Sequence, residues 1–205
     1  RGIENQPMMI KKALQYLEER SKEDKPFFLY FPACPPHSPI VPAEKFVGKS
    51  GISGKEGKYA DWVYQGDHML GQIMDALEKN GQARNTLLIA TGDNGAARRP
   101  YPPLREAKSS IYEGGHREPF VARWPGKIKP GTVSHSIICL NDFFATCADI
   151  LKADLPANAA EDSVSFLPAI LNKLDAPVRQ AIINQASEGL AVRQVFWKYI
   201  VFRNG

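Results

Sequence analysis

An acid and an amide stand side by side where an apolar run of the sequence ends. Residues 86–91, TLLIAT, are apolar or β-branched, and such a run bounded by turn residues predicts a strand buried on both faces. Asp93 and Asn94 follow it between two glycines, and they end the strand because Asp and Asn are poor strand formers. Asn-Gly is a common turn dipeptide, whereas Asp and Asn oxygens beyond the carboxyl end of a strand suit calcium or magnesium. The pair therefore indicates either a polar turn or half of a hard-cation site.

A histidine lies in a proline-rich loop after a second apolar run. Residues 26–33, PFFLYFPA, predict a buried strand, and the loop CPPHSPIVP that follows carries His37. If the two strands are parallel, His37 lies at the same sheet edge as Asp93 and Asn94. A proline-braced loop can hold an imidazole in fixed geometry. A lone loop histidine is as often an ordinary surface residue, so both interpretations stay open.

The third candidate is a lysine just before a Glu-Gly-Gly turn. The segment AKSSIYEGGHREPF, residues 107–120, carries Lys108. Paired glycines let the backbone turn tightly or approach another group closely. A lysine held beside them can bind an oxyanion as a point charge, although most lysines before turns are merely exposed.

The elements that must position these residues alternate between helices and strands. Apolar residues at helical spacing predict a helix from Pro7, with Ile10, Ala13, Leu14 and Leu17 on one face. A longer helix has its predicted apolar face at Tyr59, Val63, Gly66, Leu70, Ile73, Met74 and Leu77, with Asp67 and His68 solvated. This alternation predicts a parallel sheet covered by helices.

Further elements follow in the second half of the chain. Residues 118–131 predict another strand, 141–154 a helix with Asn141 as its cap and Phe144, Cys147, Ala148 and Leu151 inward, and 165–174 a short helix. Three strand-like runs near the C-terminus, beginning at residues 180, 190 and 197, predict an antiparallel meander. The Gly/Ser/Lys-rich stretch 48–58 predicts a mobile segment or an exposed lid.

Composition bounds the class of protein. The chain has 205 residues, 43% of them apolar, which is enough for one full core. The formal charge of +4 is mild and scattered, which gives little support to nucleic-acid binding. No stretch is apolar enough to span a bilayer, and no signal peptide opens the chain. The three cysteines show no metal-binding spacing, and Cys139 and Cys147 are expected to be buried thiols. Because the chain enters a helix almost at once without an initiator Met, we expect a piece of a longer protein.

Taken together, the motifs resemble one family. The strand followed by PPHSP, the helix followed by TLLIATGDNG, the segment KSSIYEGGHREPFVARWPGKIKPGT and the helix LNDFFATCADIL appear in the order and spacing of the sulfatases, the arylsulfatase-type members of the alkaline phosphatase-like superfamily. The resemblance covers about residues 26–155, and the C-terminal strands match more loosely.

The resemblance implies a role for each candidate residue. Asp93 and Asn94 match the pair that binds the family's calcium, and Lys108 matches the lysine that binds a sulfate oxygen. His37 matches the histidine that contacts the sulfate and assists the leaving group. A cation, a lysine and an imidazole around a sulfate are physically reasonable, since charge builds on its oxygens as the ester bond breaks.

The chain also departs from the family pattern. The family's nucleophile is a formylglycine made from the cysteine of Cys-x-Pro-x-Arg or from a serine variant, and no such motif occurs in this chain. Cys34 begins a similar run, but Ser38 stands where Arg is required. The family's first calcium-binding aspartates are also missing. We therefore expect the C-terminal part of a sulfatase, carrying part of the metal and sulfate sites and inactive alone.

The expected fold is α/β: an alkaline phosphatase-like α/β/α sandwich around a mainly parallel, truncated sheet. Residues 1–155 would belong to the catalytic domain and residues 156–205 to a small antiparallel C-terminal subdomain. The resemblance implies calcium as cofactor, a sulfate-ester small molecule or sulfated glycan as substrate, and a periplasmic, secreted or lysosomal location. The basic, aromatic loop 98–106 would favour an anionic, sugar-like substrate or be simply solvated. A phosphate or phosphonate hydrolase of the same superfamily and a catalytically dead binding domain are the alternatives.

Overall fold

The computed structural model describes residues 5–97, 101–173 and 177–203. The chain divides into two compact units, residues 1–86 and residues 87–205, and each is described by itself. The division separates two groups of residues that each pack mainly among themselves, and it does not test where domains begin or end. The predicted boundary near residue 155, between a catalytic domain and a C-terminal subdomain, stays a prediction.

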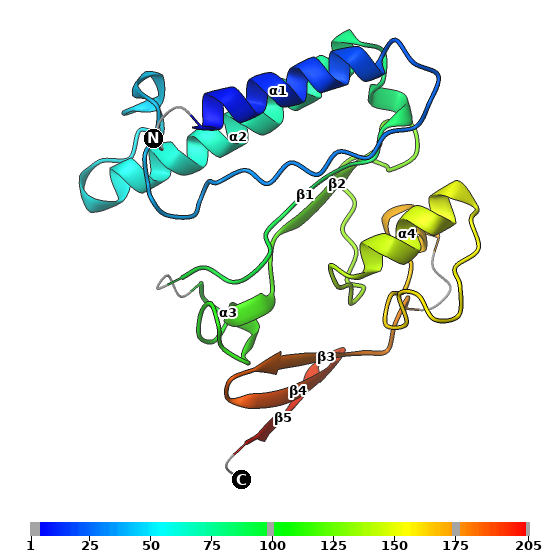
Figure 1. Cartoon of the computed structure of the whole chain (residues 1–205). Helices are drawn as coiled ribbons and strands as arrows, with labels where there is room; N and C mark the ends of the chain where they lie inside the picture. The colour runs from blue at the N-terminus through cyan, green and yellow to red at the C-terminus, as the bar shows by residue number, and fades with distance from the viewer. Residues whose placement is uncertain (1–4, 98–100, 174–176, 204–205) are drawn as a thin grey trace. The chain divides into compact units, whose positions relative to one another are not determined.

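Two helices lie side by side in the first unit (Figure 1). Helix α1 spans Asn5–Arg20 and buries Ile10, Ala13 and Leu17, as predicted, while helix α2 spans Gly57–Lys79. Three short 3-10 helices, η1 (Glu44–Phe46), η2 (Gly54–Glu56) and η3 (Ala83–Asn85), complete the regular structure described in this unit.

The buried face of α2 differs from the predicted one in its first turns. Val63 is 44% exposed, whereas Trp62 is buried. The reason lies in the loop before the helix. Trp62 Nε1 donates to the carbonyl oxygen of His37 at 2.9 Å, and Gln65 Oε1 accepts from the backbone N–H of Ala43 at 2.8 Å. These contacts turn Trp62 and Gln65 toward the interior of the unit. Asp67 and His68 are exposed, as expected.

The Gly/Ser/Lys-rich stretch, predicted to be a mobile segment or an exposed lid, is exposed over residues 51–56, and its first residues are tied to α2. Asp61, which is buried, accepts the backbone N–H of Gly48 at 2.8 Å and that of Ser50 at 2.9 Å. Hydrogen bonds from Ser50 and then from Gly48 lower the pKa of the Asp61 carboxyl, and burial opposes them. One carboxylate on α2 thus fixes a loop whose composition alone indicates flexibility.

The aromatic run at 26–33 is not a buried strand in this chain. Exposure alternates along it, with Phe28 at 71% and Tyr30 at 76% while Phe27 and Leu29 are partly covered. Such alternation is the pattern of an extended backbone. A strand also requires a hydrogen-bonded partner, and no described residue pairs with this segment. The sequence predicted the extended conformation of residues 26–33 correctly, but it could not predict whether other strands pair with them.

The second unit contains a two-stranded sheet that is antiparallel. Strand β1 (Leu88–Thr91) pairs with β2 (Phe120–Arg123), so that Thr91 lies opposite Phe120. All strand pairs among the described residues are antiparallel, so the predicted mainly parallel arrangement does not occur within them. This pairing matters for the candidate residues, because the end of β1 meets the start of β2.

Three helices accompany this sheet: α3 (Glu113–His116), α4 (Asp142–Leu151) and α5 (Leu167–Ile170). Phe120, Phe143 and Phe166 pack edge-on or tilted with ring centroids 5.3–6.2 Å apart, and Phe166 is fully buried. This aromatic cluster is the core that joins β2 to α4 and α5.

The face of α4 that packs inward is partly polar, which corrects another prediction. Phe144 and Leu151 are 56% and 63% exposed. Asp142 and Thr146 are buried instead, because they bind the chain that follows the helix: Asp142 Oδ1 accepts from Val164 N at 2.9 Å and Thr146 Oγ1 accepts from Phe166 N at 3.0 Å. Asn141 precedes the helix as predicted, without a side-chain capping hydrogen bond.

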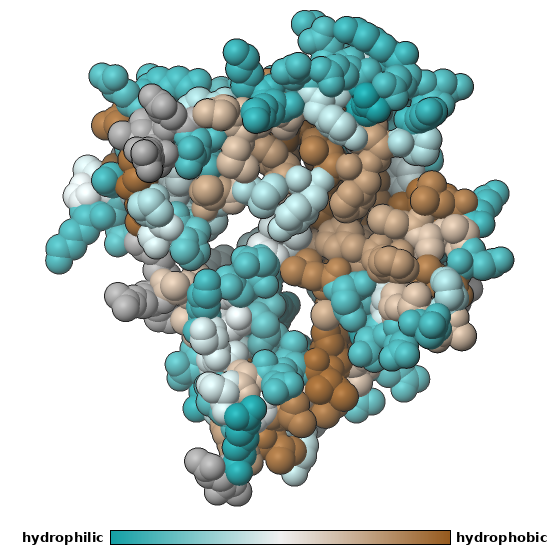
Figure 2. Space-filling view, in the orientation of Figure 1, coloured by the Kyte–Doolittle hydropathy of each residue, from teal (hydrophilic) through white to brown (hydrophobic). Residues whose placement is uncertain are grey.

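The C-terminal meander is confirmed. Strands β3 (Ala181–Ala186), β4 (Gly189–Gln194) and β5 (Trp197–Phe202) form one antiparallel sheet in that order. One face carries hydrophobic side chains that remain exposed, with Ile183, Val192 and Tyr199 in register across the three strands. Figure 2 shows hydrophobic surface over this sheet. The other face carries Asn184, Arg193 and Lys198.

The cysteines are free thiols. Cys34 is exposed, and Cys139 and Cys147 are partly buried, so the expectation that these two are buried is met only in part. Burial nevertheless raises the pKa of the Cys147 thiol. Among the described residues no helix combines the length and the apolar character needed to cross a bilayer.

Candidate functional site

Three glycines bring two of the candidate motifs into contact within the second unit. The backbone N–H of Gly95 donates to the carbonyl oxygen of Gly115 at 2.9 Å. A Cβ on Gly95 would collide with the carbonyl of Gly114, one on Gly114 with the carbonyl of Glu106, and one on Gly115 with the carbonyl of Ser110. The paired glycines therefore serve close backbone approach, one of the two uses predicted for them.

The same backbone contacts place the lysine. Lys108 N donates to the carbonyl oxygen of Ala96 at 3.2 Å, which ties the turn at 107–110 to the segment following Asn94. Gly114 N donates to the carbonyl oxygen of Arg105 at 2.8 Å and closes the loop from its other end. The two motifs, which lie apart in the sequence, are thus fastened by main-chain hydrogen bonds that do not depend on side-chain rotamers.

A cavity of about 280 Å³ lies where these segments meet the C-terminal sheet. Its lining combines residues of several segments: Asn94, Lys108, Ser109, Ser110, Gly115, His116, Asn184, Gln185 and Ala186. Among these described lining residues, Lys108 alone carries a formal charge. The structure thereby brings together two of the sequence-predicted residues, Asn94 and Lys108, on one cavity.

Asp93 lies beside a second carboxylate that the sequence did not single out. The antiparallel pairing of β1 and β2 places the segment after Thr91 next to Glu118, and a Cβ on Gly92 would collide with the Glu118 carboxylate. The pKa of Glu118 is raised by burial and then by the charge of Asp93, while His116 opposes the shift.

The donor set at this point suits a hard cation. Asn94 Nδ2 donates to the carbonyl oxygen of Gly95 at 3.4 Å, a contact that uses the amide nitrogen and not the oxygen that a metal would need. Asp93 is exposed and supplies carboxylate oxygens. Calcium takes six to eight oxygen ligands. The described residues contain no group of three His, Cys, Asp or Glu side chains placed to hold a metal, so Asp93 and Asn94 supply only part of such a shell.

His37 belongs to the first unit and is held by its neighbours there. Its Nδ1 lies 2.6 Å from the carbonyl oxygen of Ser38, which can only accept, so Nδ1 carries a proton and Nε2 is the nitrogen left for a partner. The Trp62 hydrogen bond to the His37 carbonyl fixes the backbone, and the side chain itself is exposed. The backbone of this loop is therefore tied to α2, and the exposed imidazole contacts the carbonyl of the next residue.

A cluster of charged residues fastens α3 to the C-terminal sheet. Glu113 Oε1 accepts from Lys198 Nζ at 3.0 Å, and Glu113 Oε2 lies 3.2 Å from Arg193. His116 Nε2 lies 2.9 Å from Lys198 Nζ and 3.5 Å from Glu113 Oε1. The neighbouring His116, together with Lys198 and Arg193, lowers the pKa of Glu113 to about 2, although burial opposes them.

Sequence reasoning missed His116, Asn184 and Glu118. His116 directly follows the paired glycines, and Asn184 and Gln185 are two consecutive amides inside an otherwise apolar strand. The interruption of an apolar strand by two amides was thus the one sequence feature that could have pointed to Asn184. No sequence feature pointed to Glu118, since its proximity to Asp93 follows from the antiparallel pairing of β1 with β2.

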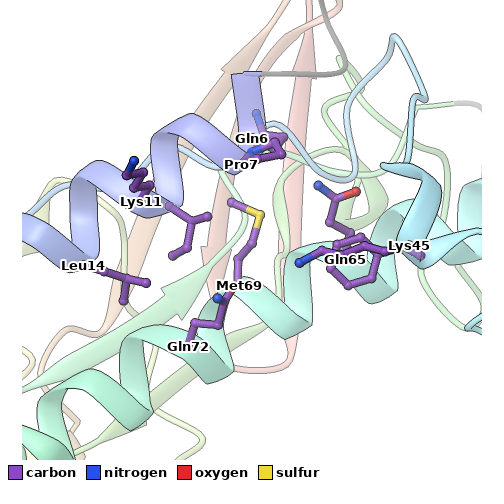
Figure 3. Close-up of a pocket in the computed structure, with 10 residues that line it drawn as sticks. Gln6, Pro7, Lys11, Leu14, Lys45, Gln65, Met69 and Gln72 are labelled. Atoms are coloured by element: carbon purple, nitrogen blue, oxygen red, sulfur yellow. The ribbon is translucent and has the colours of Figure 1, made fainter.

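A second cavity, of about 250 Å³, lies in the first unit between α1, α2 and η1 (Figure 3). Gln6, Lys11 and Leu14 line it from α1, and Gln65 and Met69 from α2. No acid, hydroxyl, thiol or imidazole is found among the described residues of its lining. Lys11 and Lys45 are the charged groups among these lining residues, and two of the glutamines already hold loop backbone.

Known proteins resemble this chain over most of its length. The family model described as Sulfatase matches residues 7–153. An N-acetylgalactosamine-6-O-sulfatase of Bacteroides thetaiotaomicron is 37% identical over 88% of the chain and 37% of its own length. Human N-acetylgalactosamine-6-sulfatase is 32% identical over 82% of the chain and 33% of its own length, and human arylsulfatase A 33% identical over 95% and 38%. The chain thus spans well under half of these relatives.

Solved structures agree. A sulfatase of Bacteroides thetaiotaomicron from work on glycosaminoglycan metabolism superposes with a TM-score of 0.86 at 33% identity, covering 98% of the chain and 44% of that protein. A sulfatase from Pseudoalteromonas sp. gives a TM-score of 0.80 at 26% identity, covering 94% and 40%. These matches confirm the expected fold class, an alkaline phosphatase-like α/β fold of which this chain holds a part.

Proposed function

The chain belongs to the sulfatase family, and we propose that it is the part of a sulfuric ester hydrolase that completes the sulfate and metal sites. The observation that carries the proposal is the cavity shared by Asn94 and Lys108, two residues that the sequence motifs predict independently of one another. The names of the relatives add the substrate class, because several are named as sulfatases of 6-sulfated N-acetylgalactosamine. We therefore propose a sulfate ester carried by a sugar as the substrate.

Lys108 binds a non-bridging oxygen of the sulfate in this proposal. Negative charge builds on the sulfate oxygens and on the leaving oxygen as the S–O ester bond breaks. An ammonium on a backbone held by main-chain hydrogen bonds stabilises that charge with little reorganisation during the reaction. Lys108 carries the only formal charge among the described lining residues, so the sulfate end of the substrate is assigned to it.

Asp93 and Asn94 are two of the proposed calcium ligands. Calcium, when bound, polarises sulfate oxygens as a Lewis acid. The carboxylate of Asp93 and the amide oxygen of Asn94 offer one charged and one neutral oxygen, the kind of ligand that this cation prefers. The carboxylate of Glu118 lies against Gly92, next to Asp93 in the chain, and adds further oxygen donors at this place.

His37 assists the leaving group. Its Nδ1 proton is given to the Ser38 carbonyl, which leaves Nε2 as the nitrogen that can face a substrate. In the protonated ring, Nε2–H donates to the oxygen of the departing alcohol and neutralises its charge.

The chain assigns no residue to nucleophilic attack. None of its three cysteines lies in Cys-x-Pro-x-Arg, and Cys34 is an exposed thiol in the His37 loop. A formylglycine would have to come from residues outside these 205, and no step through it is derived for this chain. We therefore propose that the isolated chain does not hydrolyse sulfate esters.

The experiment that tests the function compares esters with the full-length protein. It measures release of product from N-acetylgalactosamine 6-sulfate, from 4-nitrophenyl sulfate and from 4-nitrophenyl phosphate. Turnover of the sulfates with at least about 100-fold lower kcat/KM for the phosphate supports the proposal. Turnover of the phosphate alone would assign the protein to the phosphate and phosphonate hydrolases. No turnover of any of the three esters, with binding of the sugar sulfate retained, would assign it to the catalytically dead binding domains.

A further inference from the structure

One wall of the Lys108 cavity comes from the C-terminal sheet and from the end of α3, and the sulfate chemistry uses neither. Asn184 of β3 and His116 of α3 both line this wall. The inference drawn from these two residues rests on the proposed function for one point only, namely that the group bound at Lys108 is a sulfate.

Asn184 has an acceptor without a partner. It lies on the same face of the sheet as Lys198 and Arg193, toward α3, and its Oδ1 is buried with no hydrogen bond among the described residues. Buried polar atoms in folded proteins are nearly always hydrogen-bonded. An unpaired carboxamide oxygen on a cavity wall therefore indicates a donor that arrives with a ligand.

His116 has a donor whose position is set by its neighbour. Lys198 Nζ lies 2.9 Å from His116 Nε2 and Glu113 Oε1 lies 3.5 Å from it, so these two neighbours occupy Nε2. Nδ1 makes no hydrogen bond in the described part of the chain, which leaves one N–H for a ligand.

Lys198 is itself held in place. Its ammonium donates to Glu113 Oε1 at 3.0 Å, and the side chain is only 10% exposed. Arg193, one strand away, holds the other oxygen of the same carboxylate at 3.2 Å. Because both cations come from the C-terminal sheet, this cluster fixes the distance between Asn184 and the imidazole of His116.

We propose that His116 and Asn184 form a subsite for the uncharged ring that carries the sulfate. Nδ1–H of His116 donates to a ring or hydroxyl oxygen, and Oδ1 of Asn184 accepts from a hydroxyl or an amide N–H of the sugar. The cavity volume of about 280 Å³ is near the lower end of the range for ligand sites, roughly 300 Å³, which suits one ring and its sulfate. Among the described lining residues no second charged side chain is present to meet a carboxylated sugar. The ligand is therefore a neutral sugar, and Lys198 is a positioning residue for His116.

The first experiment uses the full-length protein and Asn184→Ala. For N-acetylgalactosamine 6-sulfate we expect KM to rise about tenfold with a smaller change in kcat, because a hydrogen bond to the ring is lost. For 4-nitrophenyl sulfate, which lacks the sugar, both constants should stay within about twofold. Gln194→Ala removes an exposed amide from the neighbouring strand and serves as the matched control. Equal loss on both substrates, or no loss on either, would overturn the subsite.

A second measurement separates the subsite from the hydrolysis. Binding of sulfate-free N-acetylgalactosamine is followed by saturation-transfer NMR with the wild type, Asn184→Ala and Gln194→Ala. Binding lost only in Asn184→Ala supports the subsite even if no sulfate ester is turned over, in which case the proposed function fails alone. Sulfate turnover with sugar binding unaffected by Asn184→Ala would leave the function intact and reject the subsite.

The role of Lys198 has a spectroscopic signature. The 15N shifts of the His116 ring at neutral pH, assigned with His116→Gln, should show a protonated Nδ1. In Lys198→Met the Nδ1 shift should approach the averaged value of exchanging tautomers, and Lys198→Arg should restore the wild-type value. An unprotonated Nδ1 in the wild type would contradict the assignment.

Discussion

The backbone N–H of Gly95 donates a hydrogen bond to the carbonyl oxygen of Gly115 at 2.9 Å, and this contact joins the Asp93-Asn94 motif to the turn that carries Lys108. The two glycines lie far apart in the sequence, and each faces backbone with no room for a side chain. The candidate metal ligands and the candidate sulfate ligand thus share one rigid support.

Gly95→Ala should destabilise the protein and abolish sulfate turnover together. The added Cβ would collide with the carbonyl of Gly114, and forcing an extra carbon into a packed site costs about 1–3 kcal/mol. Thermal unfolding of the full-length variant measures this. Gly71→Ala is the matched control: its Cβ meets open space within α2, so it should stabilise by about 0.5–1 kcal/mol. Equal melting temperatures for Gly95→Ala and the wild type would contradict the close approach.

Removing the proposed calcium should lower both activity and stability. A ligand present at 100 times its Kd stabilises the fold by about 2.7 kcal/mol, so chelation should lower the melting temperature of the wild type. Asp93→Asn removes the charged ligand, and we expect this variant to melt at the same temperature with and without chelator. Asp154→Asn, at an exposed position, should retain the wild-type response. A chelator effect of equal size in Asp93→Asn would place the calcium elsewhere.

His37→Ala should affect kcat according to the leaving group. Loss of a general acid costs about 100- to 10,000-fold for a sugar alcohol, which leaves poorly, and much less for 4-nitrophenolate, which leaves unprotonated. Steady-state kinetics on the two sulfates measures the ratio. His135→Ala, at an exposed histidine, is the control. Equal losses on both esters would remove His37 from the leaving-group role.

Glu113 should make stability depend on pH in the acid range. Its pKa is about 2 in the folded protein against an ordinary value of 4.5, so its contribution is complete above pH 4.5 and is lost as the pH falls toward 2. Glu113→Gln should therefore cost about 2 kcal/mol at neutral pH after allowance for partial exposure, and nothing once the pH has fallen below the folded pKa. Urea unfolding across this pH range measures the difference. Glu161→Gln, at an exposed acid, should show no such dependence; a constant deficit for Glu113→Gln at every pH would contradict the ion-pair origin.

The sequence predicted those features that local chemistry determines. The helix at Ile10, Ala13 and Leu17, the end of β1 before Asp93 and the C-terminal meander all follow from hydrophobic periodicity and turn residues. Asn94 and Lys108 were identified from family motifs, and the structure places them on one cavity. Short-range patterns and a specific motif were sufficient for these features.

Features that depend on partners far away in the chain were not predictable. The start of the 48–58 stretch is held at Gly48 and Ser50 by one carboxylate, Asp61, on the following helix. Neither strand carries a sequence pattern that predicts the antiparallel pairing of β1 with β2. The approach of Glu118 to Asp93 depends on that pairing, so it was not predictable either. His116 gains its significance only from Lys198, 82 residues later in the chain. Tertiary contacts override local pattern in each case.

The most direct test of the proposed sulfate site is the effect of Lys108→Met on sulfate hydrolysis by the full-length protein. Methionine keeps much of the apolar body of the side chain and removes the charge that the sulfate would meet. We expect kcat/KM for N-acetylgalactosamine 6-sulfate and for 4-nitrophenyl sulfate to fall together by about 100-fold or more, the loss typical of one preorganised group at the developing charge. Lys129→Met, at an exposed lysine, should leave both unchanged. A folded Lys108→Met variant with wild-type kcat/KM on both sulfates would contradict the assignment of this cavity as the sulfate site.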